Sequence, residues 1–191
     1  MIDPELAPDS PAGTPARRTS ARWRRDLVFF AIAMAVVSAD QLTKWLVRQH
    51  LELGEQWPDR SFFHMRIINV VNDGAAFGML QGHMPFLIVT SFVGLLAIVL
   101  YYVYPPMDHG LIRVALGMQL GGAIGNLIDR VRVGEVTDFV NVGRFPTFNV
   151  ADASISVSIA AVLLFFALQE VDESRKQKRP ADAGSAAGPQ D

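Results

Sequence analysis

The residues best suited to chemistry are two aspartates, Asp138 and Asp152, in the last third of the 191-residue chain. Asp138 lies in a short extended stretch, and a turn then brings Asp152 to the start of an apolar helix. Two carboxylates that share a site cannot both ionise easily, so one keeps a proton while the other activates water. Each also has a structural explanation, weaker for Asp138: Asp152 or Asn149 can cap the helix, whereas Asp is disfavoured in strands. Together they predict an aspartyl dyad.

A second polar group lies inside a long apolar stretch. Asp40 and Lys44 are four residues apart and can pair on one face of a helix. Two interpretations stay open: mutual neutralisation that lets the segment enter a membrane, or support of a nearby functional site. A third interpretation, a Ser-Lys catalytic pair with Ser38 or Ser154, has no local spacing in its favour.

Composition argues against several other chemistries. The chain has no cysteine, which removes disulfides, thiolate catalysis and cysteine metal sites. Its four histidines are scattered without ligand spacing, so we expect neither a metal site nor a cofactor. The net charge of −2 gives no indication of a nucleic-acid partner.

Small residues in the third apolar segment predict close helix packing. Three glycines recur there every four residues, namely Gly117, Gly121 and Gly125. This packing would bring Asn126 and Asp129 near neighbouring helices. We expect Asp129 and Arg130 to form or join an ion-pair network, in which Arg130 can hold a carboxylate or carbonyl through two hydrogen bonds.

Half of the residues are hydrophobic, and they are concentrated in the middle of the chain. A membrane span needs about 20 mostly apolar residues. Four segments have this length and predict a membrane domain over residues 26–170, with spans at 27–47, 84–104, 111–128 and 153–169. The flanking residues 1–25 and 171–191 lack the apolar content that would offset the entropy of ordering, so both are predicted to be disordered tails.

Basic residues flank the first and last spans, at residues 17–25 and 175–179. Lys and Arg near span ends favour the cytoplasmic side, and four spans place both tails together, so we expect both termini in the cytoplasm. The polar residues that are costly to place in or beside a membrane then lie together at the outer leaflet, and they include Asn72 of the first outer loop. In an alternative, residues 24–39 form a signal peptide cleaved before Asp40, which would leave three spans.

The first outer loop predicts a hairpin. Residues 62–71 are rich in aromatic and β-branched side chains, which is typical of a strand. We expect residues 50–57 to pair with them across a turn at residues 58–59.

The remaining outer segments extend this small sheet. The Asn-Asp-Gly sequence at residues 72–74 supplies turn chemistry, and a short surface helix is expected at residues 75–80. Residues 131–142 alternate like a strand, with a bend at Gly134.

Five motifs give the chain a resemblance to a known family. They are DQLTK (40–44), NDGAAF (72–77), GGAIGNLIDR (121–130), VTDF (136–139) and FNVAD (148–152). In this order, over residues 27–169, the chain resembles signal peptidase II, a family of bacterial membrane aspartyl peptidases also known as lipoprotein signal peptidases. NDGAAF alone would not be specific, whereas the five ordered motifs are.

The resemblance implies roles for individual residues. Asp138 and Asp152 match the family's catalytic pair, and we expect Asp152, at a helix N-terminus, to be the ionised member. Four residues match family positions that line the site: Asn72, Asn126, Arg130 and Asn149. We also expect substrate-binding or supporting roles for Asp40, Lys44, Gly74 and Asp129.

The implied fold is an all-α membrane protein with four transmembrane helices, a small extracytoplasmic β-cradle and a short surface helix. The implied activity is removal of the signal peptide from diacylglyceryl-modified prolipoproteins, by cleavage before the lipidated cysteine. We expect a monomer in the bacterial cytoplasmic membrane, with lipidated prolipoproteins and membrane lipid as its partners. A non-enzymatic carrier or assembly factor is the main alternative, although transporters place polar residues near the midplane and carry internal repeats.

Overall fold

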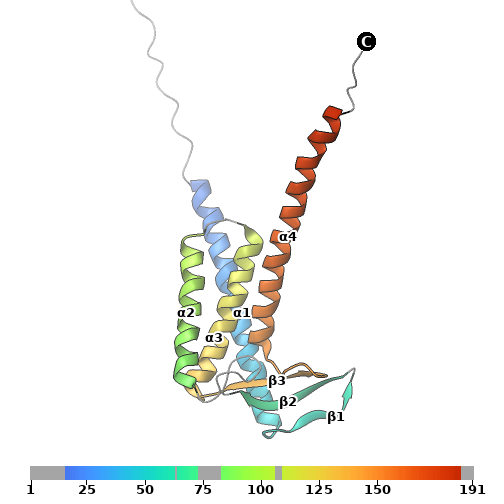
Figure 1. Cartoon of the computed structure of the whole chain (residues 1–191). Helices are drawn as coiled ribbons and strands as arrows, with labels where there is room; N and C mark the ends of the chain where they lie inside the picture. The colour runs from blue at the N-terminus through green and yellow to red at the C-terminus, as the bar shows by residue number, and fades with distance from the viewer. Residues whose placement is uncertain (1–15, 63, 73–82, 106–108, 186–191) are drawn as a thin grey trace, which may run out of the picture.

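The computed structural model describes residues 16–62, 64–72, 83–105 and 109–185. Its elements in chain order are α1 (Ala16–His50), β1 (Gln56–Phe62), β2 (Met65–Asn72), α2 (Met84–Val103), α3 (Gly110–Arg132), β3 (Val136–Val142) and α4 (Val150–Ser185). The helices form a bundle with the sheet at one end, and α1 begins and α4 ends on the opposite side (Figure 1).

Four helices are long and apolar enough to cross a membrane, over Trp23–His50, Met84–Val103, Gly110–Arg132 and Val150–Lys176. The predicted fold class is therefore confirmed: a helical membrane protein with four spans and a small sheet. The surface helix expected at residues 75–80 lies outside the described residues.

The first and last helices, α1 and α4, are longer than predicted. Residues 16–25 belong to α1 and residues 171–185 to α4, so both helices extend past the predicted spans, and disorder of the tails stays a prediction. Adding residues to an existing helix needs no new nucleus, and Arg, Lys, Glu and Ala are good helix formers. An ion pair between Lys176 Nζ and Asp172, 2.6 Å apart and one turn earlier, supports the extension of α4.

Helix α3 lies at the centre of the bundle and contacts the other three helices. The buried apolar core joins Phe29 and Ala33 of α1 to Ile112, Leu116 and Leu120 of α3. Large apolar side chains elsewhere on the helices face outward, as expected where lipid replaces water. Because Phe29 and Ala33 precede Asp40, the core uses the segment that a cleaved signal peptide would remove.

The glycines of α3 set how closely the helices approach. A Cβ atom added to Gly121 would lie 2.6 Å from the backbone oxygen of Ala33 in α1. A Cβ on Gly122 would lie 2.6 Å from the oxygen of Ala151 in α4. One on Gly125 would lie 2.6 Å from Asp40 Oδ2. The predicted packing role of the glycine repeat is therefore confirmed, and it extends to a carboxylate.

The three strands form an antiparallel sheet in the order β1-β2-β3. The predicted hairpin turn at residues 58–59 is wrong: β1 runs through Pro58 to Phe62, which pairs with Met65 at the start of β2. Helix α1 continues to His50, which moves the first strand toward the C-terminus, and an edge strand such as β1 tolerates proline. The bend at Gly134 is present, with φ of 88° between α3 and β3.

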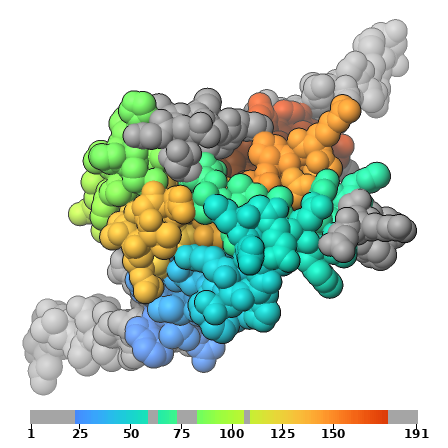
Figure 2. Space-filling view, turned by 90° about the horizontal axis from the view of Figure 1, so that it is seen from below, coloured from blue at the N-terminus to red at the C-terminus, as the bar shows by residue number. Residues whose placement is uncertain are grey.

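Viewed from the sheet end, the strands lie beside the ends of α1 and α3 (Figure 2). In β2 and β3, Val70 is the register partner of Asp138. This register places one candidate catalytic aspartate in the strand beside the ends of the helices.

The close approach of α1 and α3 gives a first prediction. Gly121→Ala should lower the stability of the purified protein by about 1–3 kcal/mol, because its methyl group meets the α1 backbone. Thermal unfolding in detergent measures this loss. Gly94→Ala on α2 is the matched control, since nothing lies within 4 Å of a Cβ there. Equal unfolding temperatures for the two variants would contradict the packing role.

Candidate active site

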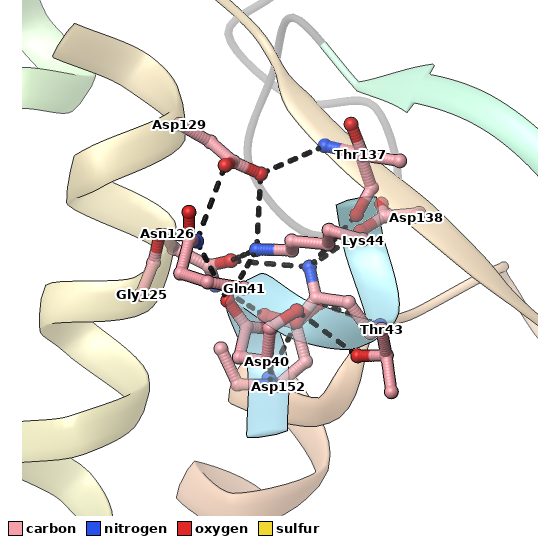
Figure 3. Close-up of polar contacts among 12 residues, drawn as sticks. Asp40, Gln41, Thr43, Lys44, Gly125, Asn126, Asp129, Thr137, Asp138 and Asp152 are labelled. Carbon is pink, nitrogen blue, oxygen red and sulfur yellow. Dashed lines mark hydrogen bonds and ion pairs between the residues drawn. The ribbon is translucent and has the colours of Figure 1, made fainter. Parts of the chain in front are cut away.

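A buried lysine joins the ends of α1 and α3. Lys44 Nζ lies 2.8 Å from Asp40 Oδ2, 3.0 Å from Asp129 Oδ2 and 2.9 Å from Asn126 Oδ1. These contacts match the three donors of an ammonium group. The side chains of Lys44 and Asp40 are fully buried, and that of Asp129 is 1% exposed. Figure 3 shows the group between the helices.

The two carboxylates also bind backbone beyond their own helices. Asp40 Oδ1 accepts a hydrogen bond of 3.0 Å from the N–H of Ala151, at the start of α4. Asp129 Oδ2 accepts one of 3.2 Å from the N–H of Thr137 in β3. Each of these backbone groups immediately precedes a candidate catalytic aspartate. The ion-pair group therefore places the chain at Asp138 and at Asp152.

Two further side chains belong to this group and were not predicted. Gln41 Nε2 donates to Asp40 Oδ2 at 3.1 Å, to the oxygen of Gly125 at 3.1 Å and to Asp129 Oδ1 at 3.3 Å. Arg48 Nη2 lies 3.2 Å from Asp129 Oδ1. The available signal was position, because Arg48 follows Lys44 by one helical turn and Gln41 lies within the DQLTK motif.

Asp129 joins this ion-pair group as predicted, whereas Arg130 makes no ion pair with it among the described residues. Consecutive residues on a helix do not face each other, and Arg130 contacts α2 instead. Its Nη1 donates to Ser91 Oγ at 3.2 Å, and its buried Nε has no hydrogen-bond partner in the described part of the chain. The partners of Asp129 are Lys44 and Arg48.

The contacts of Lys44 also decide the Ser-Lys alternative. Its three donors face Asp40, Asp129 and Asn126 rather than a serine. Ser154 Oγ donates to the backbone oxygen of Ala151 at 2.8 Å. A lysine that is ionised and fully paired cannot act as a base, so support of a nearby site is the interpretation that the geometry favours.

A capping box holds Asp152. The N–H of Asp152 donates to Asn149 Oδ1 at 2.9 Å, and the N–H of Asn149 lies 3.4 Å from Asp152 Oδ2. This reciprocal arrangement satisfies backbone donors at the start of α4. Asn149 is therefore the cap, and Asp152 lies in the first turn with its side chain half-buried.

Three asparagines connect the two candidate catalytic carboxylates. Asn149 Nδ2 donates to Asp138 Oδ1 at 2.7 Å, and Asn72 Nδ2 donates to Asp138 Oδ2 at 3.0 Å. Asn126 Nδ2 donates to Asp152 Oδ1 at 2.7 Å. The structure therefore brings together the five predicted residues that surround these carboxylates. The ion-pair group described above supplies a second layer behind them.

The environments of the two carboxylates differ. Asp138 is 2% exposed, and burial raises its pKa to about 6, with repulsion from Asp152 acting in the same direction. Hydrogen bonds from Asn72 and Asn149 and the charge of Lys44 oppose this increase. Asp152 instead lies half-buried at a helix N-terminus. The raised pKa lets Asp138 hold a proton near pH 6, which suits acid-base activation of water.

Two further predictions concern Gly74 and metal binding. Gly74 lies outside the described residues. Among the residues that the structure describes, no group of three or more His, Asp or Glu side chains could hold a metal ion.

Comparisons with known proteins agree with this geometry. Residues 32–168 match the family model described as signal peptidase (SPase) II. The lipoprotein signal peptidase of Dehalococcoides mccartyi strain BAV1 is 43% identical over 146 residues, covering 74% of this chain and 90% of the relative. That of Bacillus subtilis strain 168 is 40% identical over 158 residues, covering 80% and 99%.

Two solved structures of bacterial membrane enzymes have a similar fold. One, at 2.3 Å resolution, has a TM-score of 0.70 and 30% identity, covering 75% of this chain and 90% of the other. A second, at 1.9 Å resolution, has a TM-score of 0.66 and 32% identity, covering 72% and 91%.

The buried lysine gives a second prediction. Lys44→Met should destabilise the protein by about 3–5 kcal/mol, because it leaves buried carboxylates without a counter-charge. Thermal unfolding in detergent measures the loss. Lys176→Met is the control, because it breaks an exposed pair with Asp172 and should leave stability unchanged. An unchanged unfolding temperature for Lys44→Met would show that the network does not hold the helices together.

Proposed function

The chain belongs to the signal peptidase II family, and we propose that it is a membrane aspartic endopeptidase that removes signal peptides from prolipoproteins. Membership of a peptidase family leaves no need for the carrier alternative. We further propose that its substrates carry a diacylglyceryl group and that cleavage falls directly before the lipidated cysteine. The reaction needs no metal or other cofactor.

Asp138 and Asp152 form the proposed catalytic pair. The observation that carries this proposal is the asparagine framework around them, in which Asn149 and Asn72 bind Asp138 while Asn126 binds Asp152. The two carboxylates lie near enough for the charge of Asp152 to act on Asp138. A buried and a half-buried acid in one polar site fit general acid-base catalysis.

The proposed reaction begins with Asp152 ionised and Asp138 protonated. Asp152 takes a proton from water, and the water oxygen forms a bond to the scissile carbonyl carbon. Asp138 donates a hydrogen bond to the developing oxyanion. The carbon–nitrogen bond then breaks, and Asp138 transfers its proton to the leaving amine. Transfer of the proton on Asp152 back to Asp138 restores the starting state.

The supporting roles are divided among the other predicted residues. We assign Asn72, Asn126 and Asn149 to orientation of the two carboxylates. Asp40, Lys44 and Asp129 hold the backbone beside each aspartate. Arg130 remains a proposed substrate contact, since its unpaired Nε can donate to a carbonyl. Gly74 also stays a prediction.

Four apolar helices and bacterial relatives make the chain a bacterial multi-pass membrane protein. We propose that both termini are cytoplasmic and that the active site lies at the outer leaflet of the cytoplasmic membrane. The start of α1 and the end of α4 lie on the side of the bundle opposite the sheet, which supports this orientation (Figure 1). A substrate whose lipid lies at the outer end of its membrane helix would meet the site there. We propose that a monomer, in contact with membrane lipid, suffices.

Removal of either acid tests the catalytic pair. Asp138→Asn and Asp152→Asn should each lower kcat/KM for a purified diacylglyceryl-modified prolipoprotein by about 10²–10⁴-fold. Asp172→Asn, on the exposed end of α4, is the matched control and should cleave like the wild type. Thermal unfolding verifies that each variant is folded. A folded Asp138→Asn variant with wild-type cleavage would exclude the dyad.

The raised pKa of Asp138 predicts the alkaline side of the pH profile. Because the proposed acid must be protonated, kcat/KM should fall as pH rises above about 6. Asn72→Leu removes a hydrogen bond that lowers this pKa, so the alkaline limb should move to higher pH. Measurement of kcat/KM against pH tests this prediction. An alkaline limb that stays in place or moves to lower pH in Asn72→Leu would contradict the assignment of Asp138 as the acid.

The absence of native cysteine makes the orientation measurable. Cysteine introduced at Arg144, beside the sheet, should react with a membrane-impermeant thiol reagent in intact spheroplasts. Cysteine introduced at Tyr104, directly after the span of α2 on the side opposite the sheet, should react only after the membrane is opened. Both positions are exposed. The reverse pattern would place the active site at the inner leaflet.

A further inference from the structure

We propose that Asn126 is a positioning residue that keeps Asp152 the ionised member of the pair, and that Lys44 fixes which end of its amide faces Asp152. The inference rests on the proposed function, in which Asp152 accepts a proton from water. Asp138 also receives amide donors, from Asn149 and Asn72, but there burial outweighs them. The inference assigns the charge of half-buried Asp152 to the polarity of one amide.

Lys44 determines the orientation of the Asn126 amide. An asparagine amide can point either way unless a neighbour has only one possible role. An ammonium group only donates, and Lys44 Nζ lies 2.9 Å from one end of the Asn126 amide. That end must be the oxygen, Oδ1. The atom 2.7 Å from Asp152 Oδ1 is therefore the donor, Nδ2.

Asn149 independently requires the same orientation. The backbone N–H of Asp152 can only donate, and it binds Asn149 at 2.9 Å, so this end of the Asn149 amide is its oxygen. Asn149 Nδ2 consequently faces Asn126 at 3.1 Å and needs an acceptor there. Two donors from different elements thus converge on Asn126 Oδ1.

The fixed amide offers Asp152 a donor and no acceptor. Donation to a carboxylate oxygen favours its charged form, whereas a protonated carboxyl would need an acceptor. Two charged groups act on Asp152 from the elements packed around it, Arg130 of α3 and Asp138 of β3. Three further charged groups, Asp40, Lys44 and Asp129, belong to the adjacent ion-pair group. Among the described residues, Asn126 donates the hydrogen bond that reaches Asp152 Oδ1.

The pH dependence of cleavage tests this role. The assay measures kcat/KM against pH with a purified diacylglyceryl-modified prolipoprotein in detergent micelles. Asn126→Leu removes the donor, so the acidic limb should move to higher pH. Asn126→Asp should move it further, because a second carboxylate then faces Asp152. Asn141→Leu is the control: its amide contacts Thr147 at 3.4 Å, and the limb should stay in place.

A charge-balanced pair of changes tests the part assigned to Lys44. Lys44→Met combined with Asp129→Asn removes one positive and one negative charge, which limits the instability expected of Lys44→Met alone. The amide of Asn126 then keeps only the donor from Asn149, so one contact instead of two holds its orientation, and the acidic limb should move to higher pH. Asp129→Asn alone keeps the contact between Lys44 and Asn126, so its acidic limb should not move to higher pH; the removal of a negative charge beside the site acts in the opposite direction.

The outcomes separate this proposal from the proposed function. Folded Asn126 variants whose cleavage falls equally at every pH would show a structural role and overturn the proposal. If the acidic limb of the charge-balanced variant stayed in place, Lys44 would have no part in the proposed role of Asn126. Absence of cleavage by the wild type at every pH would instead overturn the proposed function.

Discussion

The structure depends on a lysine buried among helices that cross a membrane. Taking the Lys44 ammonium group out of water is costly, and only close, well-oriented partners repay that cost. Asp40 comes from the same helix, whereas Asp129 and Asn126 come from α3. The two helices must therefore pack without a large side chain between them, and Gly125 beside Asp40 Oδ2 permits this.

This constraint extends from the ion pairs to the two proposed catalytic residues through the backbone. Asp40 binds Lys44 with one oxygen and the N–H of Ala151 with the other, whereas Asp129 binds both Lys44 and the N–H of Thr137 with Oδ2. Each of these N–H groups lies one residue before a proposed catalytic aspartate. The register of β3 and the start of α4 are thereby fixed against the same charged group. One interaction therefore positions two segments that residues 143–149 separate in the sequence.

Sequence reasoning succeeded where an energetic cost restricts the residue types that a position can hold. Apolar runs of membrane length, charges inside them and a glycine repeat identified the spans, the network and the helix contacts. It failed where direction or local geometry decides. The reach of Arg130 toward Ser91 depends on its angular position at the end of α3, and the hairpin turn depends on how far α1 continues. The contacts of Gln41 needed the packed helices before they could be recognised.

The difference between the two aspartates has the same origin. Asp138 is buried in a strand, where loss of water favours its neutral form and outweighs two amide donors. Asp152 is half-buried at a helix start, in a capping box and beside an amide whose donor end is fixed by Lys44. A membrane site has little water to adjust its polarity, so the orientation of each dipole must be set by a neighbour with one possible role. The buried lysine supplies that neighbour, and the same cation that joins the helices thereby orders the charges of the site.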